Sequence, residues 1–205
     1  ALKILWMTKP EYRNWEWGRL MMTADLSLLT FKVGSGRAES AVFSPKGQHA
    51  LTGAWRGSVR IRDTTTGKIW KEFTGHKGKM SKVAYSPDGK KIISAGEDGT
   101  VRIWEVKSEK ELHLLEGYGK GEGDIAFSPD GKLVASAGVD GLAILWDVES
   151  GKELQKMEYK SLKIYSLVFS PDGENLVTTH DKGTVYITDL RTQVRRKVKL
   201  HSRGV

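Results

Sequence analysis

The sequence predicts an all-β protein that is built from one repeated sheet. A turn of the form Ser-Pro-x-Gly occurs four times, each copy 42 residues after the one before. Short runs rich in Val, Ile and Thr flank each copy and alternate apolar with polar side chains, which is typical of half-buried strands. One such sheet has two open edges and too little core to be stable alone. The copies are therefore expected to pack against one another.

The register between the copies extends well beyond the turn. An aromatic residue precedes each turn, a hydroxyl side chain lies in the second strand, a glycine opens the third strand and an acidic residue closes it. The four turns lie at residues 44–47, 86–89, 128–131 and 170–173. Proline presets φ, and glycine accepts positive φ, so each turn favours a tight reversal between two strands.

The copy at residues 75–105 is the most complete. Residues 80–85, 91–95 and 101–104 are predicted strands, and a second turn, Glu97-Asp98-Gly99, joins the last two. The copies on either side repeat this order, whereas residues 1–34 contain no Ser-Pro-x-Gly turn. Residues 12–17 there are rich in Trp, and they are interpreted either as a degenerate strand or as an aromatic patch that faces a partner.

A period of about 40–45 residues, with Gly-His near the start and Trp-Asp near the end, resembles the WD-repeat β-propeller family. The residues that carry the resemblance are Gly75-His76, Trp146-Asp147 and the near match Trp104-Glu105. It covers about residues 35–200 and, weakly, the first 34. It implies a β-propeller of four-stranded antiparallel blades, with about five blades in this chain. The expected blades are a degenerate N-terminal blade or ring-closing strand at 1–34 and regular blades at 35–75, 76–116, 117–158 and 159–205.

The number of blades in the complete ring stays open at this point, because the family usually closes with seven. The chain is part of a longer polypeptide, or closes its own five-bladed ring, or stays open and is completed by another subunit or a second copy. Open sheet edges associate readily, so the last alternative requires a partner.

The resemblance also implies a structural hydrogen-bond set that links a His, a Ser or Thr, an Asp and a Trp within a blade. One blade contains all four residue types, at His76, Ser94, Asp98 and Trp104. The next blade contains three of them, at Ser136, Asp140 and Trp146, and has Tyr118 at the His position. In the first regular blade, Arg56 and Arg62 replace the Asp and the Trp. The blade with the full set is expected to be the best ordered.

No pattern in the sequence indicates catalysis or a cofactor. The chain has no cysteine, so disulfides, thiolate metal sites and cysteine nucleophiles are excluded within it. Its five histidines show no metal-ligand spacing, and phosphate-binding and metalloprotease motifs do not occur. The combination of Ser, His and Asp is better explained by the repeat than by a hydrolase. We expect a protein that is not an enzyme and binds no cofactor.

The formal net charge of +8 points to acidic partners or to protected sheet edges. Part of the excess lies in the C-terminal run Arg195-Arg196-Lys197, which contains no aromatic residue for stacking on bases. Nucleic-acid binding is therefore the less favoured interpretation. No run of about 18 apolar residues predicts a membrane span. A cytoplasmic location is only the default expectation.

These observations favour a non-catalytic scaffold that binds other proteins, as a subunit or domain of a larger assembly. The alternative is the propeller domain of a larger enzyme or signalling receptor. In the family resembled here, the loops before the first strand and after the second strand form the usual docking face. The candidate partner-binding residues are Trp55, Arg56, Glu97, Tyr118, Val139, His180, Arg195, Arg196 and Lys197. For Trp55 and Arg56, a degenerate turn with no binding role is the competing interpretation.

Overall fold

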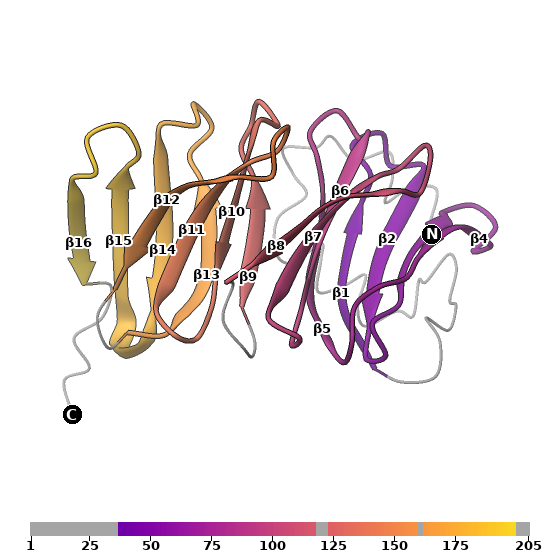
Figure 1. The fold of residues 1–205 in the computed structure, drawn as a ribbon, viewed down its shortest axis with the longest axis horizontal. Helices are drawn as coiled ribbons and strands as arrows, with labels where there is room; N and C mark the ends of the chain where they lie inside the picture. The colour runs from indigo at the N-terminus through magenta and orange to yellow at the C-terminus, as the bar shows by residue number, and fades with distance from the viewer. Residues whose placement is uncertain (1–36, 118–122, 160–161, 200–205) are drawn as a thin grey trace, which may run out of the picture. The chain divides into compact units, whose positions relative to one another are not determined.

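A computed structural model describes residues 37–117, 123–159 and 162–199, which all belong to one compact unit, Lys32–Val205. These residues form four antiparallel sheets of four strands each, and the strands of every sheet are neighbours in chain order (Figure 1). The prediction of an all-β fold with four-stranded antiparallel blades is confirmed. The predicted N-terminal blade at 1–34 lies outside the described residues.

The strand boundaries follow the 42-residue period. Blade one contains β1 (Ala38–Phe43), β2 (His49–Ala54), β3 (Val59–Asp63) and β4 (Ile69–Phe73). Blade two contains β5 (Met80–Tyr85), β6 (Lys91–Gly96), β7 (Thr100–Glu105) and β8 (Glu111–Glu116). Blade three contains β9 (Asp124–Phe127), β10 (Leu133–Ala137), β11 (Leu142–Asp147) and β12 (Glu153–Glu158). Blade four contains β13 (Ile164–Phe169), β14 (Asn175–His180), the 3-10 turn η2 (Asp181–Gly183), β15 (Thr184–Asp189) and β16 (Arg195–Lys199).

The Ser-Pro-Asp-Gly turn joins the first two strands of a blade through a small hydrogen-bond cluster. In blade two, the Ser86 hydroxyl donates to Asp88 Oδ1 at 2.7 Å and accepts from the Lys91 N–H at 2.9 Å. Gly89 has φ of 72°, a conformation that other residues adopt only with strain. Blade one has Lys46 in place of the Asp, so the Ser-to-Asp hydrogen bond is lost there. The His49 N–H still donates to Ser44 Oγ at 3.1 Å.

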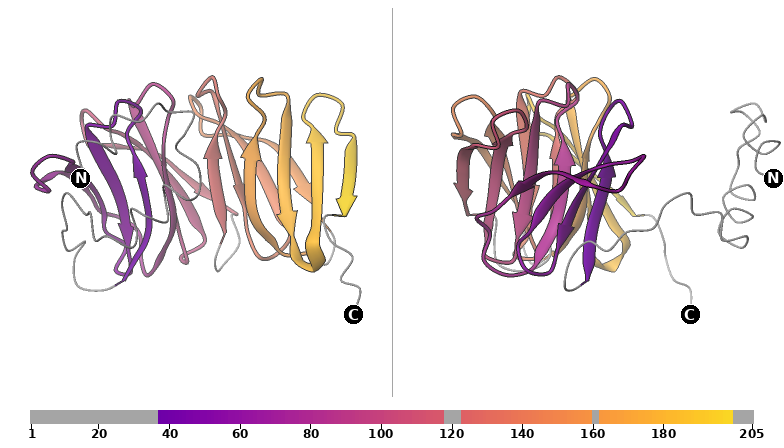
Figure 2. Two further views of the ribbon diagram at one scale, coloured as in Figure 1. Left: turned by 180° about the vertical axis from the view of Figure 1, so that it is seen from behind. Right: turned by 90° about the vertical axis from the view of Figure 1, so that its right-hand side faces the viewer.

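Each blade buries its faces against the next blade, since a four-stranded sheet has no core of its own. Between blades one and two, Leu51 and Ile61 pack with Ile92 and Trp104, and these side chains are at most 3% exposed. Similar apolar clusters lie between blades two and three and between blades three and four. The view from behind in Figure 2 shows the same chain order of the four sheets. The blades that pack together are therefore blades that follow each other in the sequence.

The innermost strands β1, β5, β9 and β13 also exchange polar contacts from blade to blade. The Val83 N–H donates to Ser40 Oγ at 3.2 Å. Two repeats later in the same register, Asp124 Oδ2 accepts from the Leu167 N–H at 3.0 Å and from Ser166 Oγ at 2.7 Å. The Asp124 carboxylate is buried, and Lys82 Nζ lies 3.4 Å from its other oxygen. Buried charge is therefore compensated across three blades.

Replacement of Ile103 by Ala should destabilise the protein by about 2–5 kcal/mol, because this fully buried side chain packs at the junction of blades two and three. Leu114 lies in the same blade but is 45% exposed, so Leu114→Ala is the matched control and should cost less than about 1 kcal/mol. Chemical denaturation followed by circular dichroism measures both changes. Equal losses in the two variants would contradict the assignment of the core.

Candidate protein-interaction rim

A continuous chain of hydrogen bonds ties the connection that precedes β5 to the second and third strands of blade two and to the turn between them. His76 Nε2 lies 2.8 Å from Ser94 Oγ, which also accepts from Trp104 Nε1 at 2.8 Å. His76 Nδ1 lies 3.1 Å from both carboxylate oxygens of Asp98. Indole N–H is only a donor, so the Ser94 hydroxyl proton is left for His76 Nε2. The ring is then neutral and carries its proton on Nδ1, toward Asp98.

Burial favours this neutral ring and lowers the pKa of His76, with the Asp98 carboxylate as the largest opposing influence. The Ser–His–Asp connectivity resembles that of a hydrolytic triad. Ser94, however, is completely buried, and its oxygen already accepts a hydrogen bond from the Trp104 indole. An acyl substrate cannot reach a hydroxyl in that position, so the cluster acts as a structural link between strands.

Blade three keeps half of this arrangement among the described residues. Trp146 Nε1 donates to Ser136 Oγ at 2.8 Å, as in blade two. Asp140 is exposed, and its Oδ1 accepts from the Leu142 N–H within its own turn at 3.1 Å. Tyr118, at the histidine position, lies outside the described residues. The hydrogen bond from Trp to Ser is therefore common to blades two and three.

Blade four contains a different network, which the sequence analysis missed. Tyr159 Oη lies 2.9 Å from Thr188 Oγ1, and His180 Nε2 lies 2.8 Å from Thr178 Oγ1. The Tyr159, His180 and Tyr186 rings pack together with centroid distances of 4.6–5.3 Å. Tyr159 precedes the expected position by one residue, so a search at fixed spacing passes over it. His180, a candidate partner-binding residue, is only 5% exposed, so its side chain offers almost no area for contact with a partner.

Blade one has lost the network at the position of the Asp. Thr52 Oγ1 donates instead to the Arg60 carbonyl at 3.3 Å, and Arg62 Nη1 donates to the Gly67 carbonyl at 3.0 Å. Arg56 takes the place of Asp98 but is exposed, and its side chain forms no hydrogen bond or ion pair with any described residue. The turn of blade one thus presents a cation that makes no polar contact with the part of the chain that the structure describes.

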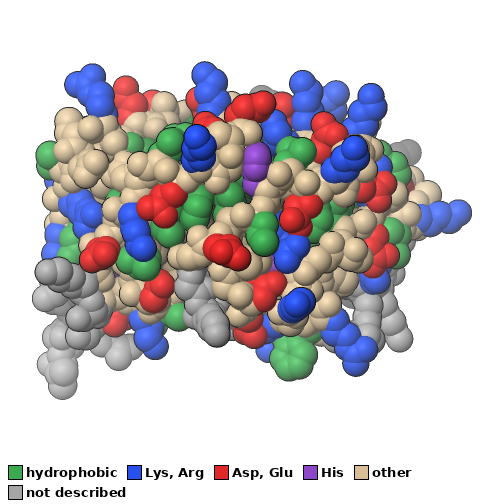
Figure 3. Space-filling model, in the orientation of Figure 1, with side chains coloured by type: hydrophobic (Ala, Val, Ile, Leu, Met, Phe, Trp, Pro, Cys, Tyr) green, Lys and Arg blue, Asp and Glu red, His purple; other side chains and the backbone are tan. Residues whose placement is uncertain are grey.

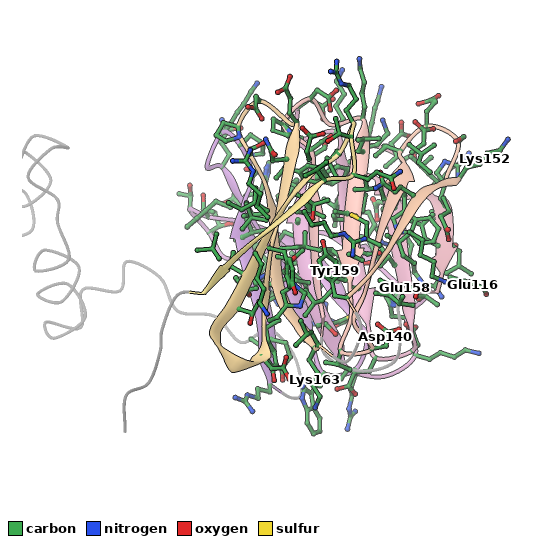
Figure 4. The ribbon with its side chains drawn as sticks, turned by 90° about the vertical axis from the view of Figure 1, so that its left-hand side faces the viewer. Glu116, Asp140, Lys152, Glu158, Tyr159 and Lys163 are labelled. Carbon is green, nitrogen blue, oxygen red and sulfur yellow. The ribbon has the colours of Figure 1, made fainter. Side chains whose placement is uncertain are left out.

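Two sets of loops lie at one end of the sheets and form a rim: the turns between the second and third strands, and the connections that lead into the next blade. Figure 4 shows this for blades three and four, where Asp140 and Lys163 lie at the lower end and Lys152 lies near the upper end. Trp55, Glu97 and Val139 occupy equivalent positions in three successive turns of this rim. Trp55 is 52% exposed, Glu97 is exposed and Val139 is partly buried.

The predicted basic run lies on the outermost strand of blade four rather than on the rim turns. Arg195 Nη1 donates to the Glu158 carbonyl at 2.7 Å, and its guanidinium lies 4.5 Å from the centroid of the Tyr159 ring. Arg196 and Lys197 are exposed. On the face shown in Figure 3, cationic and anionic side chains are interspersed, with no large field of one sign. This distribution favours local contacts with a protein over binding along a polyanion.

No group of three or more His, Asp or Glu side chains suitable for a metal ion occurs among the described residues. In the same part of the chain, no helix is long and apolar enough to cross a membrane.

The family described as WD domain, G-beta repeat matches the chain at residues 67–105, 109–147 and 151–189, which is more than half of its length. The chain therefore belongs to the WD-repeat family, as the resemblance predicted. Such repeats generally form protein-interaction scaffolds and are typically non-catalytic. No curated protein matches the chain. Each matched segment begins near the outer strand of one blade and ends with the third strand of the next, so every repeat links two blades covalently.

Ser94→Ala should destabilise the protein by about 2–4 kcal/mol, because it leaves both the Trp104 indole N–H and His76 Nε2 buried without this partner. Ser136→Ala is the matched control in blade three, where among described residues only the Trp146 indole loses its acceptor, and about half the loss is expected. Thermal and urea unfolding of both variants measure the difference. A larger loss in the Ser136 variant would show that the blade-two network is not the stronger one.

Acidification should lower the unfolding temperature as the pH falls below the ordinary histidine pKa of 6.5. The folded state lowers the pKa of His76 through burial, so the unfolded chain binds the proton first and protonation favours unfolding. Burial also lowers the pKa of His180, which adds to the effect. Unfolding temperatures measured from about pH 8 to about pH 5 should fall least in the His76→Gln/His180→Gln variant. A wild-type unfolding temperature that rises as the pH falls from about 8 to about 5 would contradict the assignment of neutral imidazole rings to His76 and His180.

Proposed function

We propose that this chain is a non-catalytic propeller scaffold that binds protein partners on the rim carrying Trp55 and Arg56. The observation that supports this most directly is that Arg56, next to the exposed Trp55, replaces the structural carboxylate of blade two. In blade two the equivalent Asp98 holds His76, Thr100 and the Lys77 N–H. In blade one, the Arg56 side chain forms no hydrogen bond or ion pair with any described residue.

The chemistry of the pair suits recognition. Trp, Tyr and Arg are the residues most enriched at binding hot spots, because they offer a large contact area together with hydrogen-bond donors. The Trp55 backbone N–H donates to the Arg37 carbonyl at 3.2 Å, which ties the turn to the start of β1. The exposed side chains therefore project from a backbone that is already ordered, and this lowers the entropic cost of binding.

The complete chain, immobilised, should select binders from a random peptide-display library. The Trp55→Ala/Arg56→Ala variant should bind the selected peptides at least about tenfold more weakly in fluorescence anisotropy, as expected for hot-spot residues. Circular dichroism should show an unchanged fold, because both side chains are exposed.

A second exposed tryptophan provides the control. Trp70 on β4 is 50% exposed and lies close to the exposed Lys68. Trp70→Ala/Lys68→Ala removes a similar pair at a different place and should leave peptide binding unchanged. Equal losses in both double variants, or no loss in the first, would contradict docking at the rim turn.

A further inference from the structure

The turn between β2 and β3 lies directly against the connection between β4 and β5. Gly57 has φ of 72°, and a Cβ atom there would lie 2.4 Å from the His76 carbonyl oxygen and 3.3 Å from that of Gly78. Only glycine fits this approach. Arg56 and Lys77, the sequence neighbours of these residues, therefore flank one backbone contact. We refer to Trp55, Arg56 and Lys77 as the basic corner.

The nearby carboxylates are already engaged within the fold. Glu72 Oε1 accepts from Arg60 Nε at 2.8 Å and lies 2.7 Å from Arg60 Nη2. Glu97 pairs with Lys79 at 3.6 Å. The side chains of Arg56 and Lys77 form no hydrogen bond or ion pair with any described residue, and both are exposed. The corner thus has two cations for which this part of the chain supplies no counter-ion.

The charge of this turn is reversed relative to the next two turns on the rim. Blade two has Glu97-Asp98 and blade three has Val139-Asp140 at the positions that Trp55 and Arg56 occupy in blade one. A long polyanion that followed the rim would meet these acids after leaving the corner, and like charges repel. A short acidic segment can contact the corner alone.

A cleft of about 310 Å³ opens beside the corner. Its polar lining consists of Arg56, Ser58, Arg60, Glu72, Thr74 and His76, and the Glu72 carboxylate is paired with Arg60. A volume of this size is at the lower end for ligand sites and admits one or two side chains of a peptide. The cleft therefore combines a guanidinium that no described residue pairs with, at its wall, and a half-exposed indole at the adjacent turn position.

We propose that the basic corner binds an acidic peptide segment of a protein partner. A carboxylate of the segment pairs with Arg56 and Lys77, and an apolar residue beside it packs on Trp55. This inference rests on the proposed function and adds the chemistry of the partner. Guanidinium groups bind carboxylates through paired N–H donors, so Arg56 supplies direction as well as charge.

Peptides selected by the wild-type chain should be enriched in Asp or Glu next to an apolar residue, compared with the unselected library. Arg56→Glu/Lys77→Glu should weaken binding of the strongest peptide by about tenfold or more, because it sets like charges against each other. A version of that peptide with Lys in place of each acid should bind the reversed variant better than the wild type. Arg196→Glu/Lys197→Glu on β16 is the matched control, since it changes the same charge at another exposed site.

The outcomes separate this inference from the proposed function. Selected peptides that are not acidic, but are lost in Trp55→Ala/Arg56→Ala, would leave rim docking intact and overturn the acidic partner. A charge reversal at the corner that weakens binding no more than the control would also overturn it. If the wild-type chain selects no peptide above background, both proposals fail. Tighter binding of single-stranded RNA than of the acidic peptide would assign the corner to a different class of partner.

Discussion

Face-to-face packing of neighbouring sheets is the interaction on which the rest of this structure depends. None of the four blades has a core of its own, and residues such as Leu51, Ile103 and Leu145 are buried only because the next sheet covers them. Each matched repeat supplies the outer strand of one blade and three strands of the next. The covalent chain and the apolar clusters therefore join the same neighbours, and the rim loops are held by sheets that stabilise one another.

The polar networks determine how securely each rim loop is held. Blade two satisfies Ser94, His76 and Trp104 together, and buried polar groups that are all satisfied make a structure rigid. Blade four uses Tyr159 and its neighbours instead, through aromatic packing and hydroxyl pairs, but His180 Nδ1 is buried there without a hydrogen-bond partner among the described residues. Blade one dispenses with the carboxylate, and the contact between Gly57 and the His76 carbonyl keeps its turn close to blade two. A position that is structural in one repeat thereby becomes available for binding in another.

This division suggests how a repeat fold acquires a specific surface. Three copies retain acidic side chains in the rim turn, and in two of them the carboxylate accepts a hydrogen bond from a backbone N–H of the same turn. The copy that departs from this pattern exposes Trp55 and Arg56 next to Lys77, while Glu72 and Glu97 are paired elsewhere. If the proposed docking at the basic corner holds, fold and recognition use the same positions in different repeats, and substitutions in the corner change binding more than stability.

The sequence by itself determined the all-β fold, the 42-residue period and the place of the first three strands of each copy, because turn chemistry and strand alternation are local properties. It also indicated the residues of the blade-two network through the family resemblance. Only the tertiary structure decided that Tyr159 enters the blade-four network, that His180 is buried and that Asp124 joins blades three and four. It alone also decided which acidic side chains form ion pairs and which cations have no counter-ion among the described residues. Those facts depend on distances between residues far apart in the chain, and no spacing rule encodes them.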